Sequence, residues 1–284
     1  PTAQKDKFGA GKNGFTRGNP QTGTPATELD DDYFDMLQEE LATVVEATGV
    51  ALDKAKRNQL LTALNNLFPT TGRLLNVQTF TSSGTYTRTP GMRFCIVKGI
   101  GGGGAGGGAP ATASGNVGLG AGGHAGAYGE GQFTAAQIGA SQTVTVGSGG
   151  TGSPTSGGNG GSSSLGSLIT FGGGMGASSS GNTAPPLNAG NGNASAVCTG
   201  ANIISGTGQL SIIGQITSTS VGYSGTGANS PFGAGGGAIN TTGNGVAANG
   251  YGAGGSGACA FSSNATARSG GNGSQGFVII FEYS

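Results

Sequence analysis

The first hydrophobic pattern along the chain has the spacing of a helix. Five residues recur at alternating steps of three and four and form one seam that ends before Gly49: Phe34, Leu37, Leu41, Val44 and Thr48. Acidic residues at 30, 31, 32 and 35 fill the first turn, where the helix dipole favours negative charge, and Thr27 or Asp30 can cap it. A second helix is expected over 53–67, because leucines at 60, 61, 64 and 67 precede Pro69. The pattern predicts a short helical hairpin whose apolar faces pack on each other or on other copies of the chain.

After Gly72 the period changes to two, which is typical of β-strands. Apolar residues alternate with others through 80–97, and Pro90-Gly91 marks a turn within this region. The last segment, 277–283, is apolar on both faces for most of its length. We expect the opening and closing strands to pair in one sheet, with weaker strands over 142–146, 167–171 and 209–216.

Glycine dominates the remainder, since 55 of the 64 glycines lie from Gly99 onward. The glycine runs lack the period of three and the proline content of collagen, and 34% hydrophobic residues argue against disorder. Each glycine costs roughly 0.5–1 kcal/mol of backbone entropy relative to alanine in regular structure. Close backbone packing with many hydrogen bonds, or packing between chains, must offset that cost, so we expect a homo-oligomer.

These patterns predict a mainly β fold in which a short N-terminal helical hairpin precedes a Gly-rich, β-sandwich-like tip. Packed polyglycine-II rods are the alternative for the tip. Composition changes near Lys98, but the strands begin earlier. We therefore assign residues 1–72 to a fibre or helical attachment region and residues 73–284 to a Gly-rich distal domain.

Charge is scarce in the Gly-rich part, and this scarcity excludes several kinds of chemistry. Glu130 is the sole charged residue from Gly99 to Ala267, whereas glycoside cleavage normally needs two carboxylates. We expect Glu130 to accept hydrogen bonds from backbone N–H groups in a turn. The formal net charge of zero gives no general attraction for nucleic acid.

Other candidate sites fail on spacing. The glycine fingerprint after Lys98 runs into more glycine and Pro110 where nucleotide binding would require a helix. His124 has no second ligand at metal-binding spacing, so a structural or surface role is expected. Cys95, Cys198 and Cys259 have no paired spacing and are expected to be buried thiols. We therefore expect no enzyme activity, no cofactor and no metal.

Neither a secretion signal nor a membrane-spanning segment is expected. The start of the chain, Pro1-Thr2-Ala3-Gln4, lacks a basic-then-apolar pattern, and no stretch of about 18 apolar residues is present. These features predict a soluble protein without membrane insertion.

Several segments, in their order along the chain, resemble the distal part of bacteriophage tail fibres. The segments are Lys12 to Pro20, Thr22-Gly23, Pro25 to Thr27, Gln38 to Leu41, Phe80 to Pro90 leading into the first glycine run, Gly129 to Gly131, Ile138 to Gly147, Ser230 to Gly233, and Gly276 to Tyr283. The resemblance implies a homotrimeric fibre that is assembled in the host cytoplasm, is mounted on other tail or baseplate proteins, and binds a bacterial surface receptor. It also implies an assembly chaperone, and a place on a virion or a phage-derived particle.

An uncharged tip rich in Ser, Thr, Asn and scattered aromatic residues is suited to sugar rings. A glycan such as lipopolysaccharide is therefore the expected receptor, with a pilus or an outer-membrane protein as the alternative. A structural fibre or decoration segment that binds no receptor also remains open.

Receptor contacts are expected in the irregular connections between the strands, because binding residues concentrate in loops on a rigid scaffold. The four connections chosen by composition are 109–119, 175–187, 221–229 and 239–261. The candidate receptor-binding residues in or at the ends of these connections are Tyr223, Tyr251, Phe261, Asn229 and Asn249. The aromatic members either stack against a sugar ring or fill a thin core.

Overall fold

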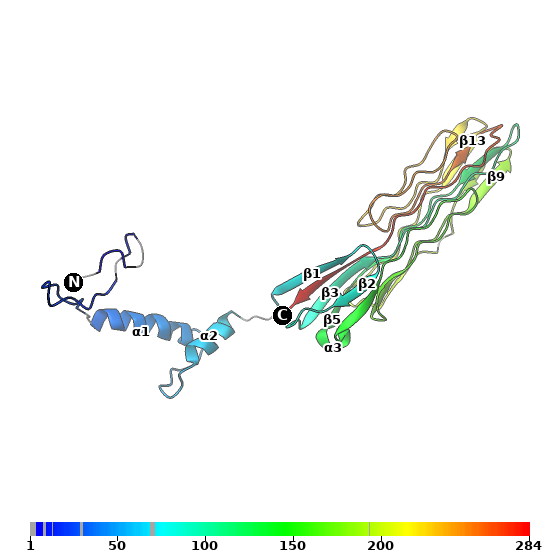
Figure 1. The fold of residues 1–284 in the computed structure, drawn as a ribbon. Helices are drawn as coiled ribbons and strands as arrows, with labels where there is room; N and C mark the ends of the chain where they lie inside the picture. The colour runs from blue at the N-terminus through cyan, green and yellow to red at the C-terminus, as the bar shows by residue number, and fades with distance from the viewer. Residues whose placement is uncertain (1–3, 8–9, 13, 29–30, 69–71, 193) are drawn as a thin grey trace. The chain divides into compact units, whose positions relative to one another are not determined.

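The computed structural model describes residues 4–7, 10–12, 14–28, 31–68, 72–192 and 194–284. The chain divides into two compact units, Pro1–Thr70 and Thr71–Ser284 (Figure 1). The architecture is mainly β with few helices, as the alternation of apolar residues predicts.

The first unit contains a helical hairpin. α1 (Asp31–Glu46) begins with Asp31 and Asp32 in its first turn, and α2 (Gln59–Leu67) contacts it. Val45 and Ala63 are the residues that these helices bury. Most of the predicted seam of α1 stays on the surface of the single chain. Of the two predicted caps, Thr27 accepts a hydrogen bond from Thr16 N–H at 2.9 Å, and Asp30 lies outside the described residues.

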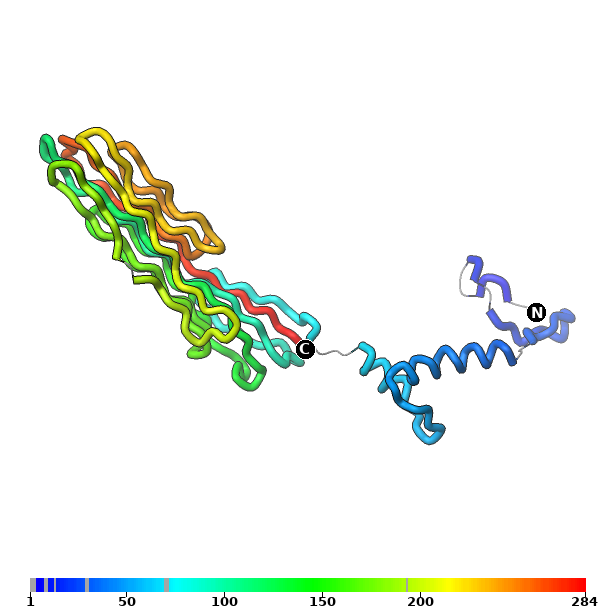
Figure 2. The backbone as a smooth tube through the Cα atoms, turned by 180° about the vertical axis from the view of Figure 1, so that it is seen from behind, coloured from blue at the N-terminus to red at the C-terminus, as the bar shows by residue number. Residues whose placement is uncertain are grey.

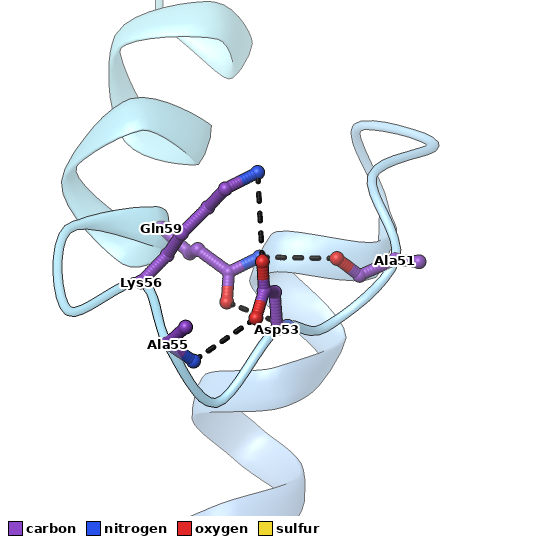
Figure 3. Close-up of polar contacts among 5 residues, drawn as sticks. All are labelled: Ala51, Asp53, Ala55, Lys56 and Gln59. Atoms are coloured by element: carbon purple, nitrogen blue, oxygen red, sulfur yellow. Dashed lines mark hydrogen bonds and ion pairs between the residues drawn. The ribbon is translucent and has the colours of Figure 1, made fainter.

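The predicted start of the second helix at Asp53 is wrong, because side chains hold residues 53–58 in a turn (Figure 3). The Asp53 carboxylate accepts the N–H of Ala55 at 2.9 Å. Gln59 then closes the turn from the helix, since its Oε1 accepts the N–H of Asp53 at 2.9 Å and its Nε2 donates to the carbonyl of Ala51 at 3.0 Å. Asp side chains that bond their own backbone favour turns over helix interiors.

Two five-stranded sheets lie near the C-terminus, at one end of the second unit (Figure 1). The first has the order β1 (Leu74–Phe80), β16 (Phe277–Tyr283), β3 (Phe94–Ile100), β5 (Tyr128–Thr134), β12 (Ile204–Ser205). The second has the order β11 (Cys198–Thr199), β8 (Ile169–Phe171), β7 (Ser163–Leu165), β6 (Ser141–Thr145), β2 (Gly84–Thr87). A four-residue helix, α3 (Ala135–Ile138), follows β5.

The closing strand pairs with the opening strands as expected. β16 is antiparallel to both β1 and β3, and all seven of its residues pair with β3 from Phe94 to Ile100. Side chains of both sheets share one buried core, which includes Tyr86, Val97, Phe171 and Ile280. Within β3 the core side chains are Cys95 and Val97, whereas Phe94 and Ile96 are half-buried, so the alternation predicts the strand but not which of its faces is buried.

Between the sheets and the opposite end of the unit, the glycine-rich segments run side by side (Figure 2). Their backbone hydrogen bonds repeat every three residues, with donor–acceptor distances of 2.6–3.2 Å in the segment 101–109. Successive N–H groups of this segment point to three different neighbours: residues 101, 104 and 107 donate to 121–127, residues 102, 105 and 108 donate to 155–161, and residues 103, 106 and 109 donate to 268–274.

A period of three distinguishes these segments from β-strands, whose pairing has a period of two. Three residues per turn is the geometry of polyglycine-II-type helices, which make no internal hydrogen bonds. The carbonyls of the same segment accept from further neighbours, since Gly103, Gly104 and Ala105 receive the N–H groups of residues 150, 255 and 177. Six segments therefore surround 101–109. The two sheets and these packed rods occur in one domain. The polyglycine-II alternative is therefore correct for the middle of the domain.

Glycine is required in the rods because the backbones are in direct contact. A Cβ atom built on Gly106 would overlap the carbonyl oxygen of Ser256, and one built on Gly103 would overlap that of Ala253. No larger residue fits without moving a neighbouring backbone. The hydrogen bonds that this close approach permits satisfy the buried peptide groups.

Two three-stranded sheets lie at the end of the rods that is remote from the C-terminus (Figure 1). Their orders are β10 (Leu187–Ala189), β13 (Gly214–Ser218), β14 (Val221–Tyr223) and β15 (Cys259–Ala260), β4 (Val117–Gly120), β9 (Ser179–Thr183). A second core, including Leu119 and Ile216, joins them.

The predicted strand over 209–216 is wrong for its first part, since β13 begins at Gly214. The carbonyl of Gln209 accepts from Ala125, whereas the N–H of Ile212 donates to Thr226. Successive residues of this segment bond to different neighbours, which is the pattern of the rods and not of a β-ladder. Apolar content alone therefore misidentifies the segment as a strand.

Candidate functional site

The four connections chosen from composition are only partly loops. Residues 110–116 and 184–186 are irregular chain at the remote end, next to β4 and β9. Residues 224–228 and 252–260 are instead largely buried, and most of them are rod segments. The prediction that the whole of 221–229 and 239–261 forms surface loops is therefore wrong. Small residues are needed inside the packed rods as well as in turns.

The structure separates the five candidate residues into two groups. Tyr223 pairs with Gln215 in the remote sheet, and Phe261 packs against the second core. Asn229, Asn249 and Tyr251 lie near the other end of the rods. There Tyr251 stacks on Phe277 of β16, with ring centroids 5.1 Å apart.

The two aromatic residues at the remote end differ in their exposure to solvent. Tyr223 is 48% exposed, so its ring is open to solvent. Phe261 is half-buried, and two threonines hold its backbone: its N–H donates to Thr242 Oγ1 at 2.9 Å and its carbonyl accepts from Thr112 Oγ1 at 2.7 Å. Phe261 therefore has a packing role in this chain.

Four rings form an aromatic row at the end of the rods that lies next to the five-stranded sheets: Tyr128, Phe232, Phe277 and Tyr251. Phe232 lies between Tyr128 and Phe277, at centroid distances of 5.6 and 5.5 Å. A tight turn places Phe232, since Ser230 Oγ accepts the N–H of Phe232 at 3.1 Å. Phe232 stays 36% exposed, so part of the aromatic row faces solvent.

A groove of about 350 Å³ adjoins this row. Its walls come from three segments that are distant in sequence: Ala125, Gly126 and Tyr128; Gly206, Thr207 and Gln209; Asn229, Ser230 and Pro231. Asn229 is the candidate that lines the groove, while Asn249 accepts the N–H of Gly250 with its side chain at 2.8 Å.

Charge beside the groove is neutralised locally. The Tyr128 hydroxyl donates to the Glu130 carboxylate, and Lys98 Nζ lies 3.2 Å from the other carboxylate oxygen. The Tyr128 hydrogen bond, with help from Lys98, holds the pKa of Glu130 below its usual value. Burial raises the pKa of Tyr128. The prediction that the Glu130 carboxylate accepts hydrogen bonds from backbone N–H groups is wrong, because its partners are the side chains of Tyr128 and Lys98.

His124 is buried and structural. Its Nδ1 accepts the N–H of Ser211 at 2.9 Å, and its Nε2 lies 2.7 Å from the carbonyl oxygen of Gly192. The Nε2–H tautomer satisfies both partners. Within the described ranges, no group of three or more His, Cys, Asp and Glu residues is placed to hold a metal ion.

The three cysteines are free and buried, as their spacing predicts. Burial raises the pKa of Cys95 and of Cys259 to about 11. Both side chains therefore stay protonated thiols at neutral pH.

Sequence reasoning missed three residues of the groove, namely Tyr128, Thr207 and Gln209. They lie far apart along the chain, and no motif connects them. The Ser-Pro-Phe-Gly turn at 230–233 is the one local signal nearby, because it marks a bend that carries a large aromatic side chain.

Comparison with known proteins identifies the second unit. Residues 79–283, which include all the rods and every strand except most of β1, match the glycine-rich domain. The chain belongs to this family. Over 66 residues, or 23% of its length, it is also 80% identical to protein StfP of Escherichia coli (strain K12). That match spans 32% of StfP, so the chain corresponds to about a third of this relative.

The rods described above are thus the middle of the glycine-rich domain, and the groove and aromatic row belong to it. No helix in the described part of the chain has the length and apolar character needed to cross a membrane.

Proposed function

We propose that this chain is the receptor-binding end of a bacteriophage-type tail fibre, on a virion or a phage-derived particle, and that it attaches to the bacterial surface without catalytic chemistry. The main support is the way in which the glycine-rich domain is built. Backbone hydrogen bonds hold the rods, while large side chains gather at their two ends and on the outer segments. Such a scaffold presents variable binding residues without depending on them for its fold. The match to StfP and the tail-fibre-like segments agree with this role.

A glycan such as lipopolysaccharide is the proposed receptor class. Glu130 is the sole charge from Gly99 to Ala267, and Lys98 already neutralises it. Neutral hydroxyl and amide groups beside aromatic rings suit the hydroxyl-rich and apolar faces of sugars. An outer-membrane protein or a pilus is the alternative receptor.

The functional particle is proposed to be a homotrimer that assembles with the help of a chaperone and docks on other tail or baseplate proteins. Large apolar side chains of the helical hairpin remain exposed in the single chain, including Phe34 at 51%, Leu41 at 47% and Leu61 at 63%. Such residues are stabilised when copies of the chain cover them.

Adsorption to cells tests the proposal directly. The purified, fluorescently labelled full chain is mixed with a panel of Escherichia coli strains that carry different surface polysaccharides. Binding to a subset of strains, lost after periodate oxidation of the cell-surface sugars, supports a glycan receptor. Binding lost after protease treatment supports a protein receptor, and binding to no strain favours a purely structural fibre or decoration segment.

A further inference from the structure

We infer that the groove beside Tyr128 binds one neutral pyranose ring of the receptor glycan, with Thr207, Gln209 and Asn229 as its hydrogen-bonding residues. This inference rests on the proposed attachment to a glycan and assigns it a place and a sugar class.

The size and walls of the groove fit a single sugar ring. Its volume of about 350 Å³ lies at the lower end of the range for small-ligand sites. Tyr128 lines it, and the partly exposed ring of Phe232 is 5.6 Å from the Tyr128 ring. Aromatic rings offer apolar surface to the C–H face of a pyranose, while hydroxyl groups at the sugar's edge remain free for hydrogen bonds.

The polar groups of the groove have unused hydrogen-bonding capacity. No described residue is hydrogen-bonded to Thr207 Oγ1, to the side-chain amide of Gln209 or to Asn229 Nδ2. Together they offer a hydroxyl, a carbonyl oxygen and two NH₂ groups. A sugar hydroxyl both donates and accepts, so this mixture suits vicinal hydroxyl groups.

The backbone that carries these groups is held in place before any ligand arrives, and the Asn229 side chain is held as well. Asn229 Oδ1 accepts the N–H of Gly235 at 2.8 Å, which anchors its amide. Gln209 belongs to a segment whose carbonyl accepts from Ala125 at 3.0 Å, and Thr207 forms a bridge with Val197. Groups that are already ordered lose little entropy when a ligand binds.

The charges near the groove favour a neutral sugar over an acidic one. Lys98 is the cation next to Tyr128 and Glu130, and it is engaged with the Glu130 carboxylate at 3.2 Å. Of the described residues that line the groove, none carries a charge, so an acidic sugar would find no cation there to pair with. Neutral hexoses and N-acetylhexosamines are the expected ligands, whether they come from lipopolysaccharide or from a capsule.

Ligand-detected NMR on the full chain tests this site. The probes are the methyl glycosides of glucose, galactose, mannose and N-acetylglucosamine, with 3-deoxy-manno-octulosonate as the acidic sugar. At least one neutral glycoside should bind, and the acidic sugar should not. Thr207→Val and Gln209→Ala should each weaken the bound glycoside by about three- to tenfold, the loss expected for one hydrogen bond.

Thr219→Val is the matched control, because Thr219 is exposed, lies in the turn between β13 and β14 and has no hydrogen bond to its hydroxyl within the described chain. It should leave glycoside binding unchanged. Melting temperatures of all three variants should equal that of the parent, since each altered side chain is exposed. Equal binding by the parent and the groove variants, or no binding of any neutral glycoside, overturns the site.

Cell adsorption separates this site from the proposed function. If the parent protein adsorbs to cells and the groove variants adsorb equally well, the groove inference fails and host attachment stands. If the glycosides bind in the groove but the parent adsorbs to no cells, the site stands and the proposed function fails. Competition with purified O-polysaccharide or purified capsule distinguishes the two sources of the sugar.

Discussion

Tyr86 donates a hydrogen bond to the buried carboxylate of Glu282, with 2.8 Å between the two oxygens. Tyr86 belongs to β2 in the second five-stranded sheet and Glu282 to β16 in the first. The bond therefore joins the two sheets across their shared core. Thr89 adds two more hydrogen bonds to the same carboxylate, from its N–H at 2.8 Å and its hydroxyl at 2.5 Å.

This carboxylate should make stability depend on pH. Burial pushes the pKa of Glu282 upward, but the hydrogen bonds from Thr89, Tyr86 and Gln78 outweigh burial and hold the pKa below its ordinary value. A group with a lowered folded-state pKa stabilises the protein above its unfolded pKa, about 4.3 for Glu, and loses that effect as pH falls through the folded pKa.

Glu282→Gln should accordingly lower the free energy of unfolding at pH 7 by about 1–3 kcal/mol, because the hydrogen bonds lose their charge assistance. The difference from the parent should shrink below about pH 4. Thermal melts from pH 7 to pH 3 measure both effects. A stability gap that stays constant over this range contradicts the assignment.

Gly106→Ala should strongly destabilise the rods. The new Cβ would overlap the carbonyl oxygen of Ser256, and neighbouring rods leave no room for that backbone to move. We expect a loss of about 3 kcal/mol or more in the free energy of unfolding, measured by urea denaturation. Gly237→Ala is the control, since its Cβ would meet no atom within 4 Å. Similar losses in both variants would show that the tight packing is not the cause.

His124→Ala should destabilise the outer segments of the rods. The substitution leaves the N–H of Ser211 and the carbonyl of Gly192 without their partner. Each of these groups that stays buried should lower the free energy of unfolding by about 1–3 kcal/mol. Amide hydrogen exchange at Ser211 should also become faster. An unchanged exchange rate at Ser211, together with an unchanged melting temperature, would be incompatible with this role.

Alanine substitutions at Tyr223 and Tyr251 should behave differently. Tyr223 is 48% exposed, so Tyr223→Ala should reduce adsorption to host cells and leave the melting temperature within a few degrees of the parent. Tyr251→Ala should lower stability, because stacking on Phe277 adds about 0.5–1.5 kcal/mol to the effect of burial. Normal adsorption by Tyr223→Ala would show that this ring at the remote end does not contact the receptor.

The exposed seam of α1 should hold copies of the chain together. Leu37→Asp combined with Leu41→Asp should convert a particle of three chain masses into single chains, as measured by light scattering, because buried charge opposes assembly. Met36→Asp is the control, since Met36 is 53% exposed on the same helix but lies off the seam. A parent protein of one chain mass contradicts the proposed trimer.

Local side-chain patterns were sufficient to predict several features of this fold. Alternating apolar residues at 92–97 and the apolar run at 277–283 predicted two strands that pair, and β3 and β16 do so over their full length. Helical spacing predicted α1, and the isolated cysteines predicted buried thiols. In each case the spacing of the side chains along a short segment specifies the type of element.

No local pattern predicted which rods are neighbours or which candidate residues come together, because both depend on the path of the folded chain. A glycine run has no side chains that distinguish one face from another, so nothing local specifies that 101–109 lies among six particular segments. The contacts of Gln59 with the turn before α2, and the assembly of Tyr128, Gln209 and Asn229 around one groove, follow from the path of the folded chain. Backbone hydrogen bonds between distant segments decide these placements, and they leave no periodic signal in the sequence.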